Sequence, residues 1–279
     1  MPLKATELKP RIGSLVELDL DALLGGAFAE DIRALLEERG VLLIRGLELN
    51  DEQQLAFTRS LGRLGDADAG TIYKVTFDKR ENPTHADYNY GNFSWHIDRT
   101  DTDVPPFATI LTAKRLATRG GETEFANTYA AYEDLPADDK RLIEGLKVLH
   151  KLESSYRESI PHPTEAQLAT WRAHADKVHP LVWRHRSGRK SLITSMSATE
   201  VLGMSREDGA ALLARLMTWA TQPQYVYVHE WRLGDIVLWD NTGTMHRARR
   251  YDTSCGRLMH RTTVLGDEPF DPINAPLAA

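Results

Sequence analysis

Hydrophobic residues recur at helical spacing near the start of the chain. Residues 28–39 follow this spacing, and the pattern stops at Gly40, a residue that favours the end of a helix. The apolar run at 41–44 predicts a short buried strand. Asn50 and Gln53 have the spacing of a capping box, so a second helix is expected to begin after Asn50. The first third of the chain is therefore predicted to alternate between helix and strand.

After about residue 106 the apolar residues occur in short runs separated by glycine turns, which is typical of strands. The predicted strands are 107–116, 122–125, 181–185, 190–194, 225–231, 236–240 and 257–265. The segments 181–185 and 190–194 flank a turn and predict a hairpin, and 225–231 and 236–240 are expected to form another strand pair. Ser205 is expected to cap a helix that runs to Ala220. This pattern predicts an α+β, mainly β, protein: a sandwich or barrel with flanking helices.

The segment 153–177 interrupts this series of strands. It is polar, contains Pro161 and Pro163, and is long for a plain connection. We therefore expect a lid-like insertion over a site. The 279 residues suit one catalytic domain, 1–279, with a large core.

Composition narrows the classes of function. The net charge of −6 gives no basic footprint for a nucleic-acid partner. Cys255 is the only cysteine, which excludes an intrachain disulfide and a multi-thiolate metal site. No apolar run approaches the roughly 18 residues that a membrane span needs, and the polar first residues do not form a secretory signal. We expect a cytoplasmic enzyme that acts on a small molecule.

The motif His-x-Asp is the first candidate for chemistry, and it occurs at His85, His96 and His174. About one such pair is expected by chance from the composition. His174 lies in residues 164–177, which look helical and begin with Thr164 and Gln167 at the spacing of a capping box. Residues two apart diverge on a helix, and His85 lies in an apparent loop. In residues 93–98, alternation places Ser94, His96 and Asp98 on one strand face, which is what two ligands of one ion require. We therefore predict that His96 and Asp98 bind the metal.

A third ligand must come from elsewhere in the chain. His246 follows the apolar strand and turn at 236–245 and is the candidate. Two histidines and one carboxylate leave positions open on iron(II) for a co-substrate and oxygen. Arg257 and Arg261 alternate onto one face of the last strand, about 13 Å apart, and guanidinium groups bind carboxylates in a two-pronged manner. Either these arginines form salt bridges at an exposed edge, or they bind anions in a site.

Taken in order, these motifs resemble those of the taurine dioxygenase and 2,4-dichlorophenoxyacetate dioxygenase family. The order is Trp-His-x-Asp at 95–98, Gly-Gly-Glu-Thr at 120–123, Trp-Asp-Asn at 239–241 before His246, and Arg257 eleven residues after that histidine. The resemblance runs from residues 40–46 to 269–270. It implies a double-stranded β-helix (jelly roll) that uses iron(II), 2-oxoglutarate and dioxygen, and it implies that dimers or tetramers are common.

Carried over residue by residue, the resemblance makes His96, Asp98 and His246 the metal ligands. Arg257 would bind the distal carboxylate of 2-oxoglutarate with help from the Thr123 hydroxyl. The substrate side would include Asn92 and Arg261. To these we add Tyr73, Tyr90 and Tyr156 as candidates for the substrate wall, although ordinary packing would explain tyrosines equally well.

The chain also departs from the family pattern. Taurine enzymes carry a histidine about thirty residues before the first ligand, whereas residues 67–70 here read Ala-Asp-Ala-Gly, which argues against taurine as substrate. Asp98 is present where halogenating relatives lack the carboxylate, so hydroxylation of a small organic anion (carboxylate, sulfonate or sulfate) is favoured. Desaturation, cyclisation or C–N oxidation on the same scaffold, and a non-catalytic metal-binding barrel, are the alternatives.

Overall fold

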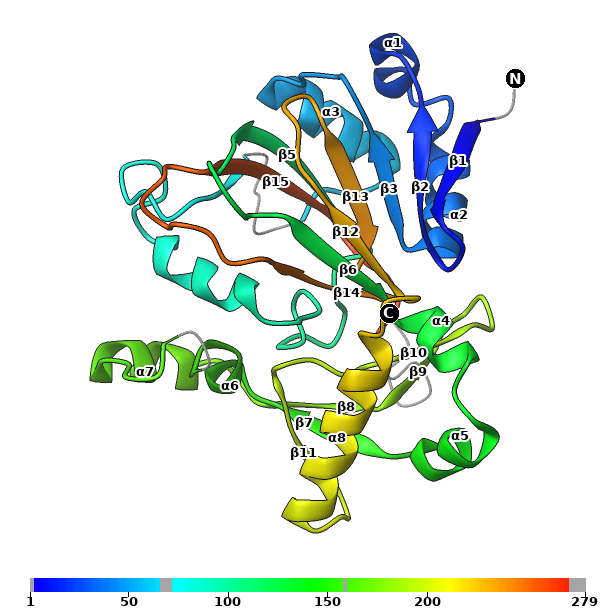
Figure 1. The fold of residues 1–279 in the computed structure, drawn as a ribbon, viewed down its shortest axis with the longest axis vertical. Coiled ribbons are helices and arrows are strands. Elements are labelled where there is room, and N and C mark those ends of the chain that lie inside the picture. The colour runs from blue at the N-terminus through cyan, green and yellow to red at the C-terminus, as the bar shows by residue number, and fades with distance from the viewer. Residues whose placement is uncertain (1–2, 66–71, 158–159, 271–279) are drawn as a thin grey trace.

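Two β-sheets face each other across a shared core in the computed structural model, which describes residues 3–65, 72–157 and 160–270. The larger sheet has the order β1-β2-β3-β13-β5-β15-β4 and the smaller one the order β12-β6-β14 (Figure 1). The strands of the larger sheet are β1 Lys4–Lys9, β2 Ile12–Glu17, β3 Val41–Ile44, β4 Tyr73–Val75, β5 Ala108–Arg115, β13 Ile236–Asp240 and β15 Leu258–Val264. Those of the smaller sheet are β6 Thr123–Asn127, β12 Val226–His229 and β14 Thr244–Ala248. All neighbouring strands are antiparallel except β2 and β3.

The core between the sheets follows from the alternation of side chains along each strand. Val237 and Trp239 of β13 pack there against Phe125 of β6 and Tyr227 of β12. The alternate residues of the large sheet, such as Leu238, face the opposite way and contact the N-terminal helices. This arrangement of facing sheets, with helices outside, is the predicted sandwich with flanking helices and has the layout of a jelly roll, but helix and strand are both extensive, so the protein is not mainly β.

Three helices cover the outer face of the large sheet: α1 Leu20–Leu24, α2 Ala29–Arg39 and α3 Asp51–Leu61 (Figure 1). The predicted stop at Gly40 is confirmed, with φ +74, and the Asn50–Gln53 capping box is present at the start of α3. Glycine adopts this backbone conformation without the penalty that a Cβ imposes.

The small sheet packs with its other face against a third layer of mixed structure, which Figure 1 shows beneath the two sheets. Its helices are η1 Ala86–Phe93 (a 3-10 helix), α4 Thr128–Glu133, α5 Ala137–Ile143, α6 Leu152–Arg157, α7 Glu165–Arg172 and α8 Arg206–Ala220. Its strands are β7 Lys147–His150, β8 Lys177–Pro180, β9 Val182–Arg184, β10 Lys190–Leu192 and β11 Ala198–Val201. The hairpin β9–β10 and the Ser205 cap of α8 confirm two sequence predictions. Within the described ranges, no helix has the length and apolar character needed to cross a membrane.

The predicted pairing of 225–231 with 236–240 is wrong. β12 pairs with β6 in the small sheet, whereas β13 lies between β3 and β5 in the large one. The turn between β12 and β13 is held in place by Asp235, whose carboxylate accepts hydrogen bonds of 2.8 and 3.0 Å from Arg45. Because both edges of β13 are already paired, β12 has no free edge to join.

Two further boundaries differ from the sequence prediction. The segment around His96 and Asp98 is not a full strand: His96 forms an isolated bridge with His246, and Asp98 begins a turn. The helix predicted over 164–177 keeps its Thr164–Gln167 capping box but ends at Arg172. The helical part of that segment is therefore shorter than its polar pattern predicted.

Candidate metal centre

His96, Asp98 and His246 are brought together by one backbone contact. The His96 N–H donates to the His246 carbonyl at 3.1 Å, and the His246 N–H donates to the His96 carbonyl at 2.9 Å. This bridge ties the end of the 86–98 segment to β14 and places the two imidazole rings 4.1 Å apart. The Oδ1 atom of Asp98 lies 3.8 Å from Nε2 of His96 and 3.7 Å from Nε2 of His246. The two histidines and Asp98 each have a ligand atom within 4.8 Å of the others.

The protonation of these groups suits a metal. Nδ1 of His96 lies 2.8 Å from the Ser94 carbonyl, which can only accept, so Nδ1 carries a proton and Nε2 is the atom that would bind a metal. Burial lowers the pKa of His246 well below its usual value and keeps that ring neutral. Burial opposes ionisation of Asp98, but the charge of Arg261 and the hydrogen bond from Thr109 favour the carboxylate and keep its pKa below the usual value.

This donor set fits iron(II). Two neutral imidazole nitrogens and one carboxylate oxygen converge on one volume, which is the ligand set of non-haem iron sites that keep positions open. At these distances the carboxylate and the two imidazoles have lost part of the water that would stabilise their charges. A bound cation would replace that stabilisation. The chemistry of the donors, rather than their number, therefore favours a divalent metal.

The other two His-x-Asp pairs are not part of this centre. His85 precedes η1 and contacts Thr84, while Asp87 pairs with Lys79 at 3.1 Å. His174 lies 3.4 Å from Asp101, and its own partner in the motif, Asp176, pairs instead with Lys151. Of the three pairs, His96 and Asp98 are the one that the structure brings together with another histidine, and their role as ligands stays a prediction.

Arg257 is buried immediately before β15, with 4% of its surface exposed. Among the described residues its polar contacts are the Gly121 carbonyl, at 3.2 Å, and Tyr251, whose ring centre lies 5.0 Å from the guanidinium carbon. Burial lowers the pKa of Arg257, because no carboxylate among these contacts compensates its charge. A buried guanidinium in this state is suited to an incoming carboxylate.

Thr123, the first residue of β6, is also buried. Its Oγ1 accepts a hydrogen bond of 2.9 Å from the indole N–H of Trp231. The hydroxyl proton of Thr123 therefore stays available to donate to another acceptor. Sequence reasoning had not singled out Trp231, because a lone tryptophan between two strands carries no signal of its partner.

Arg261 lies next to the triad, in the middle of β15. Its charge acts on both Asp98 and His246, and together with Asp98 it lines a cavity of about 200 Å³. The guanidinium stacks on the ring of Tyr73 at 4.5 Å. Its buried Nε atom has no hydrogen-bond partner among the residues that the structure describes. Arg261 is thus a cation beside the candidate metal centre, and its Nε–H group is available to donate a hydrogen bond to a ligand.

Aromatic side chains adjoin this arginine. Burial raises the pKa of Tyr156 well above its usual value, Tyr88 and Tyr73 add to this, and Arg261 opposes it, so these groups lie near one another. Tyr156 packs edge-on against Tyr88 at 5.5 Å and stacks with Trp171 at 5.2 Å. Tyr88 was missed by sequence reasoning because its place in the wall depends on the fold of η1.

Two of the predicted substrate residues lie differently. Tyr90 packs with Phe77 at 4.7 Å, in a cluster that also contains Phe93 and Tyr251, on the Arg257 side. The Asn92 side chain donates to Asn89 at 3.2 Å. Residues 67–70, where the sequence lacks the early histidine of the taurine enzymes, fall outside the described residues.

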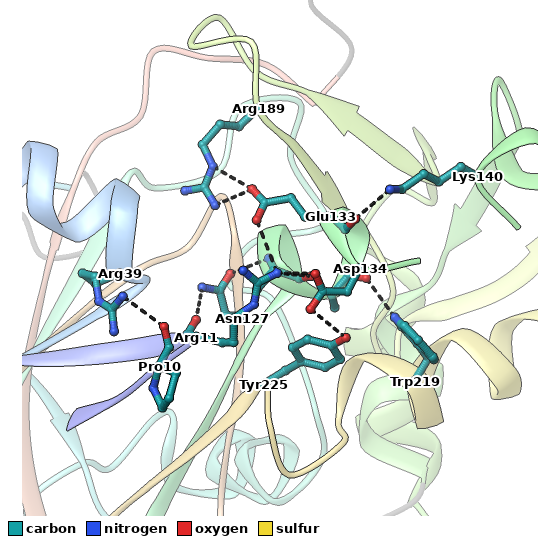
Figure 2. Close-up of polar contacts among 12 residues, drawn as sticks. Pro10, Arg11, Arg39, Asn127, Glu133, Asp134, Lys140, Arg189, Trp219 and Tyr225 are labelled. Carbon is teal, nitrogen blue, oxygen red and sulfur yellow. Dashed lines mark hydrogen bonds and ion pairs between the residues drawn. The ribbon is translucent and has the colours of Figure 1, made fainter. Parts of the chain in front are cut away.

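A separate cavity of about 370 Å³ opens between the β1–β2 turn, α2 and α4. Figure 2 shows its charged residues: Arg189 contacts Glu133, Arg11 contacts Asp134, and Arg39 contacts the Pro10 carbonyl. Each guanidinium has a partner here, although Nε of Arg11 and Nε of Arg39, like Nε of Arg261, have no hydrogen-bond partner among the described residues. This network joins the N-terminal hairpin to α4, and unlike the site around Arg261 it does not adjoin the group of potential metal ligands.

Comparison with known proteins identifies close relatives of the whole chain. Residues 4–263 match the family described as taurine catabolism dioxygenase TauD, TfdA family. The chain is 35% identical over 287 residues to the alpha-ketoglutarate-dependent 2,4-dichlorophenoxyacetate dioxygenase of Cupriavidus pinatubonensis (strain JMP 134 / LMG 1197), covering 96% of this chain and 99% of the relative. It is 34% identical over 274 residues to the enzyme of that name from Burkholderia sp. (strain RASC), covering 91% of each. The solved structure of AAD-2 in complex with Mn(II) and N-oxalylglycine superposes with a TM-score of 0.84 at 34% identity, over 97% of this chain and 99% of the other.

Proposed function

The chain belongs to the TauD, TfdA dioxygenase family, and from this premise we propose that it hydroxylates a C–H bond of a small aromatic anion held by Arg261. The protein is an enzyme that depends on iron(II), 2-oxoglutarate and dioxygen. The observation that supports the substrate proposal is Arg261: an incompletely satisfied guanidinium beside the triad, stacked on Tyr73.

His96, Asp98 and His246 are the proposed ligands of iron(II). When bound, iron(II) and 2-oxoglutarate supply the oxidising chemistry, in which dioxygen is consumed, the co-substrate is converted to succinate and carbon dioxide, and a C–H bond of the substrate is hydroxylated. The protein holds the reacting groups in place and keeps bulk water away from them. Burial of His246 and of Trp95, the residue before His96, serves this second purpose.

Arg257 and Thr123 are the proposed anchors of 2-oxoglutarate. The guanidinium of Arg257 would receive the distal carboxylate, since it is buried and its contacts leave its charge uncompensated. The Thr123 hydroxyl would donate to the same carboxylate, because Trp231 already supplies the hydrogen bond that its oxygen accepts. Anchoring at the distal end would leave the keto acid end free to bind at the metal.

The substrate wall is proposed to consist of Arg261 and the rings of Tyr73, Tyr88 and Tyr156. Arginine binds a carboxylate with paired hydrogen bonds, and tyrosine rings favour an aromatic body. This agrees with the relatives, whose name specifies 2,4-dichlorophenoxyacetate. Tyr90 and Asn92 are proposed only as outer substrate contacts, since their observed partners lie within η1 and its aromatic cluster.

The segment 153–177 is proposed to act as a lid over this wall. Tyr156, a residue of α6, is part of this wall. Its ring lies so close to Gly91 of η1 that a Cβ added to the glycine would be 2.9 Å from it. Trp171 of α7 stacks behind Tyr156. One catalytic domain, a dimeric or tetrameric assembly and a cytoplasmic location stay predictions from the sequence and the family resemblance.

The proposal is tested by succinate release from 2-oxoglutarate with iron(II) over a panel of aryloxyacetates, aryl sulfonates and aryl sulfate esters, each paired with a neutral amide or alcohol analogue. We expect turnover with at least one anion and little with its neutral analogue. Arg261→Gln should raise KM for that anion about 10- to 100-fold, since charged hydrogen bonds contribute about 1.5–3 kcal/mol. Arg250→Gln, which alters an exposed arginine stacked on Phe93, is the matched control.

The products separate the alternatives. Hydroxylation adds one oxygen atom, and on the carbon beside the ether oxygen of an aryloxyacetate it gives a hemiacetal that divides into a phenol and glyoxylate. Desaturation or cyclisation instead removes two hydrogen atoms from the substrate, and mass spectrometry of the products distinguishes these outcomes. If wild type releases no more succinate than His96→Ala with any compound, the enzyme assignment fails. If Arg261→Gln keeps the wild-type KM for the anion, the substrate assignment fails while the enzyme assignment stands.

A further inference from the structure

The carboxylate of Asp98 has two oxygen atoms in different surroundings. Oδ1 faces the imidazoles of His96 and His246, at 3.8 and 3.7 Å from their Nε2 atoms. Oδ2 faces the large sheet, where it accepts a hydrogen bond of 3.0 Å from the Thr109 hydroxyl. The two oxygens are therefore distinguished before any metal binds.

This hydrogen bond is the last of a buried series. The Asn241 amide nitrogen lies 2.7 Å from the Thr109 hydroxyl oxygen, and the Asn241 amide oxygen lies 2.8 Å from the indole nitrogen of Trp239. Thr109 and Asn241 are fully buried, and Trp239 is 2% exposed. The series thus lies where water cannot replace a missing partner.

The direction of every bond follows from its first member. An indole N–H can only donate, so the Asn241 oxygen must accept from it. That fixes the orientation of the amide, whose N–H2 group then faces Thr109 and donates to its oxygen. The hydroxyl of Thr109 is left to donate its own proton, and the acceptor in place is Oδ2 of Asp98.

The backbone makes this series rigid. Thr109 of β5 and Trp239 of β13 are directly paired in the large sheet. Asn241 follows β13 and is fixed by its N–H, which donates to the Phe107 carbonyl at 3.0 Å. Asp98, by contrast, lies in a turn beside Arg99, a residue with φ +60. The sheet therefore restrains a carboxylate that its own turn would hold less firmly.

We propose that Trp239, Asn241 and Thr109 form a positioning relay. Its last hydrogen bond, from Thr109, holds Oδ2 of Asp98 against the large sheet, so that only Oδ1 is available to bind the metal. The inference rests on the proposed role of His96, Asp98 and His246 as ligands. A carboxylate that binds through one oxygen occupies one coordination position, so the relay keeps a further position open for co-substrate and dioxygen. None of the three relay residues contacts the metal in this scheme.

The test is the affinity of the purified protein for Mn(II), measured by electron paramagnetic resonance without co-substrate or turnover. Thr109→Val removes the hydroxyl at nearly constant volume, and Thr109→Ala removes it without placing a methyl group against Asn241. We expect either variant to bind Mn(II) about 10- to 100-fold more weakly, the usual effect of losing a partner of a metal ligand. Thr109→Ser, which keeps the hydroxyl, should restore most of the affinity.

Thr112→Val is the matched control. Thr112 lies on the same strand, is 3% exposed, and donates to Gln54 at 2.8 Å, away from the metal centre. It should lower the melting temperature about as much as Thr109→Val but leave the Mn(II) affinity within about twofold of wild type. A merely structural role for Thr109 would make the two variants alike in both measurements.

The outcomes are distinct. Unchanged Mn(II) affinity in Thr109→Val and Thr109→Ala, or an equal loss in Thr112→Val, overturns the relay. His96→Ala separates this result from a failure of the ligand assignment. If His96→Ala binds Mn(II) as tightly as wild type, the metal centre itself is wrong; if only His96→Ala is weakened, the centre stands and the relay falls.

Discussion

Replacement of Arg257 by methionine should change stability and ligand binding in opposite directions. The guanidinium is 4% exposed, and among the described residues its contacts are the Gly121 carbonyl and Tyr251. A neutral side chain of similar length avoids the cost of burying that charge. We expect Arg257→Met to raise the melting temperature of the ligand-free protein by roughly 2–6 °C, from a gain of about 1–2 kcal/mol.

The same change removes the proposed partner of the 2-oxoglutarate carboxylate. Truncating one member of a buried charged pair costs about 2–5 kcal/mol, so a loss near 3 kcal/mol corresponds to a roughly 150-fold weaker Kd. With Mn(II) and N-oxalylglycine, a dicarboxylate analogue, at about 100 times Kd, wild type should gain about 2.7 kcal/mol, or roughly 5–10 °C. Arg257→Met should show almost none of this gain at the same concentration.

The assay is thermal unfolding with and without N-oxalylglycine, supported by calorimetric titration. Arg250→Met changes an exposed arginine in the same part of the chain and should leave both melting temperatures unchanged. The reasoning would be refuted if Arg257→Met kept the wild-type ligand shift. A loss of stability in the ligand-free variant would likewise show that Arg257 is a structural residue whose charge is already compensated.

Three further changes test other parts of the structure. Gly243→Ala should destabilise the fold by about 3 kcal/mol or more in urea unfolding, since the added Cβ would lie 1.7 Å from Cε2 of Tyr129. Burial lowers the pKa of His150 to about 3, so the stability it contributes is complete above pH 6.5 and is lost as the pH falls toward 3, by up to about 1.4 kcal/mol per pH unit; His150→Gln should flatten the pH dependence of unfolding. Trp231→Phe removes the donor to Thr123 and should weaken N-oxalylglycine binding several-fold by calorimetry.

These predictions have separate controls and contrary outcomes. Gly145→Ala, at a glycine with no heavy atom near its added Cβ, shows the cost of a strained backbone alone, and equal losses would contradict the steric argument. An unchanged slope of stability against pH in His150→Gln would mean that another group titrates. Trp219→Phe removes an indole hydrogen bond to Ala131 away from the site and should not alter N-oxalylglycine binding.

Local features of this protein could be predicted from the sequence because each depends on neighbouring residues. The caps at Asn50, Thr164 and Ser205 satisfy helix ends within three residues, and all three are present. Alternation at 93–98 directed His96 and Asp98 to one side, although the strand proved to be a single bridge. The order and spacing of the motifs then identified the family, because both can be read from the sequence without knowledge of the fold.

The tertiary structure decided which segments meet. The sequence shows β12 and β13 as neighbours, but β13 pairs with β3 and β5 because pairing depends on edges contributed by distant segments. Likewise, nothing near Thr109 shows that its hydroxyl faces Asp98 and the amide of Asn241, which lies 132 positions along the chain. Periodicity along a chain specifies which face of a strand is buried, whereas hydrogen bonds between strands depend on register, and register is set only when the sheets assemble.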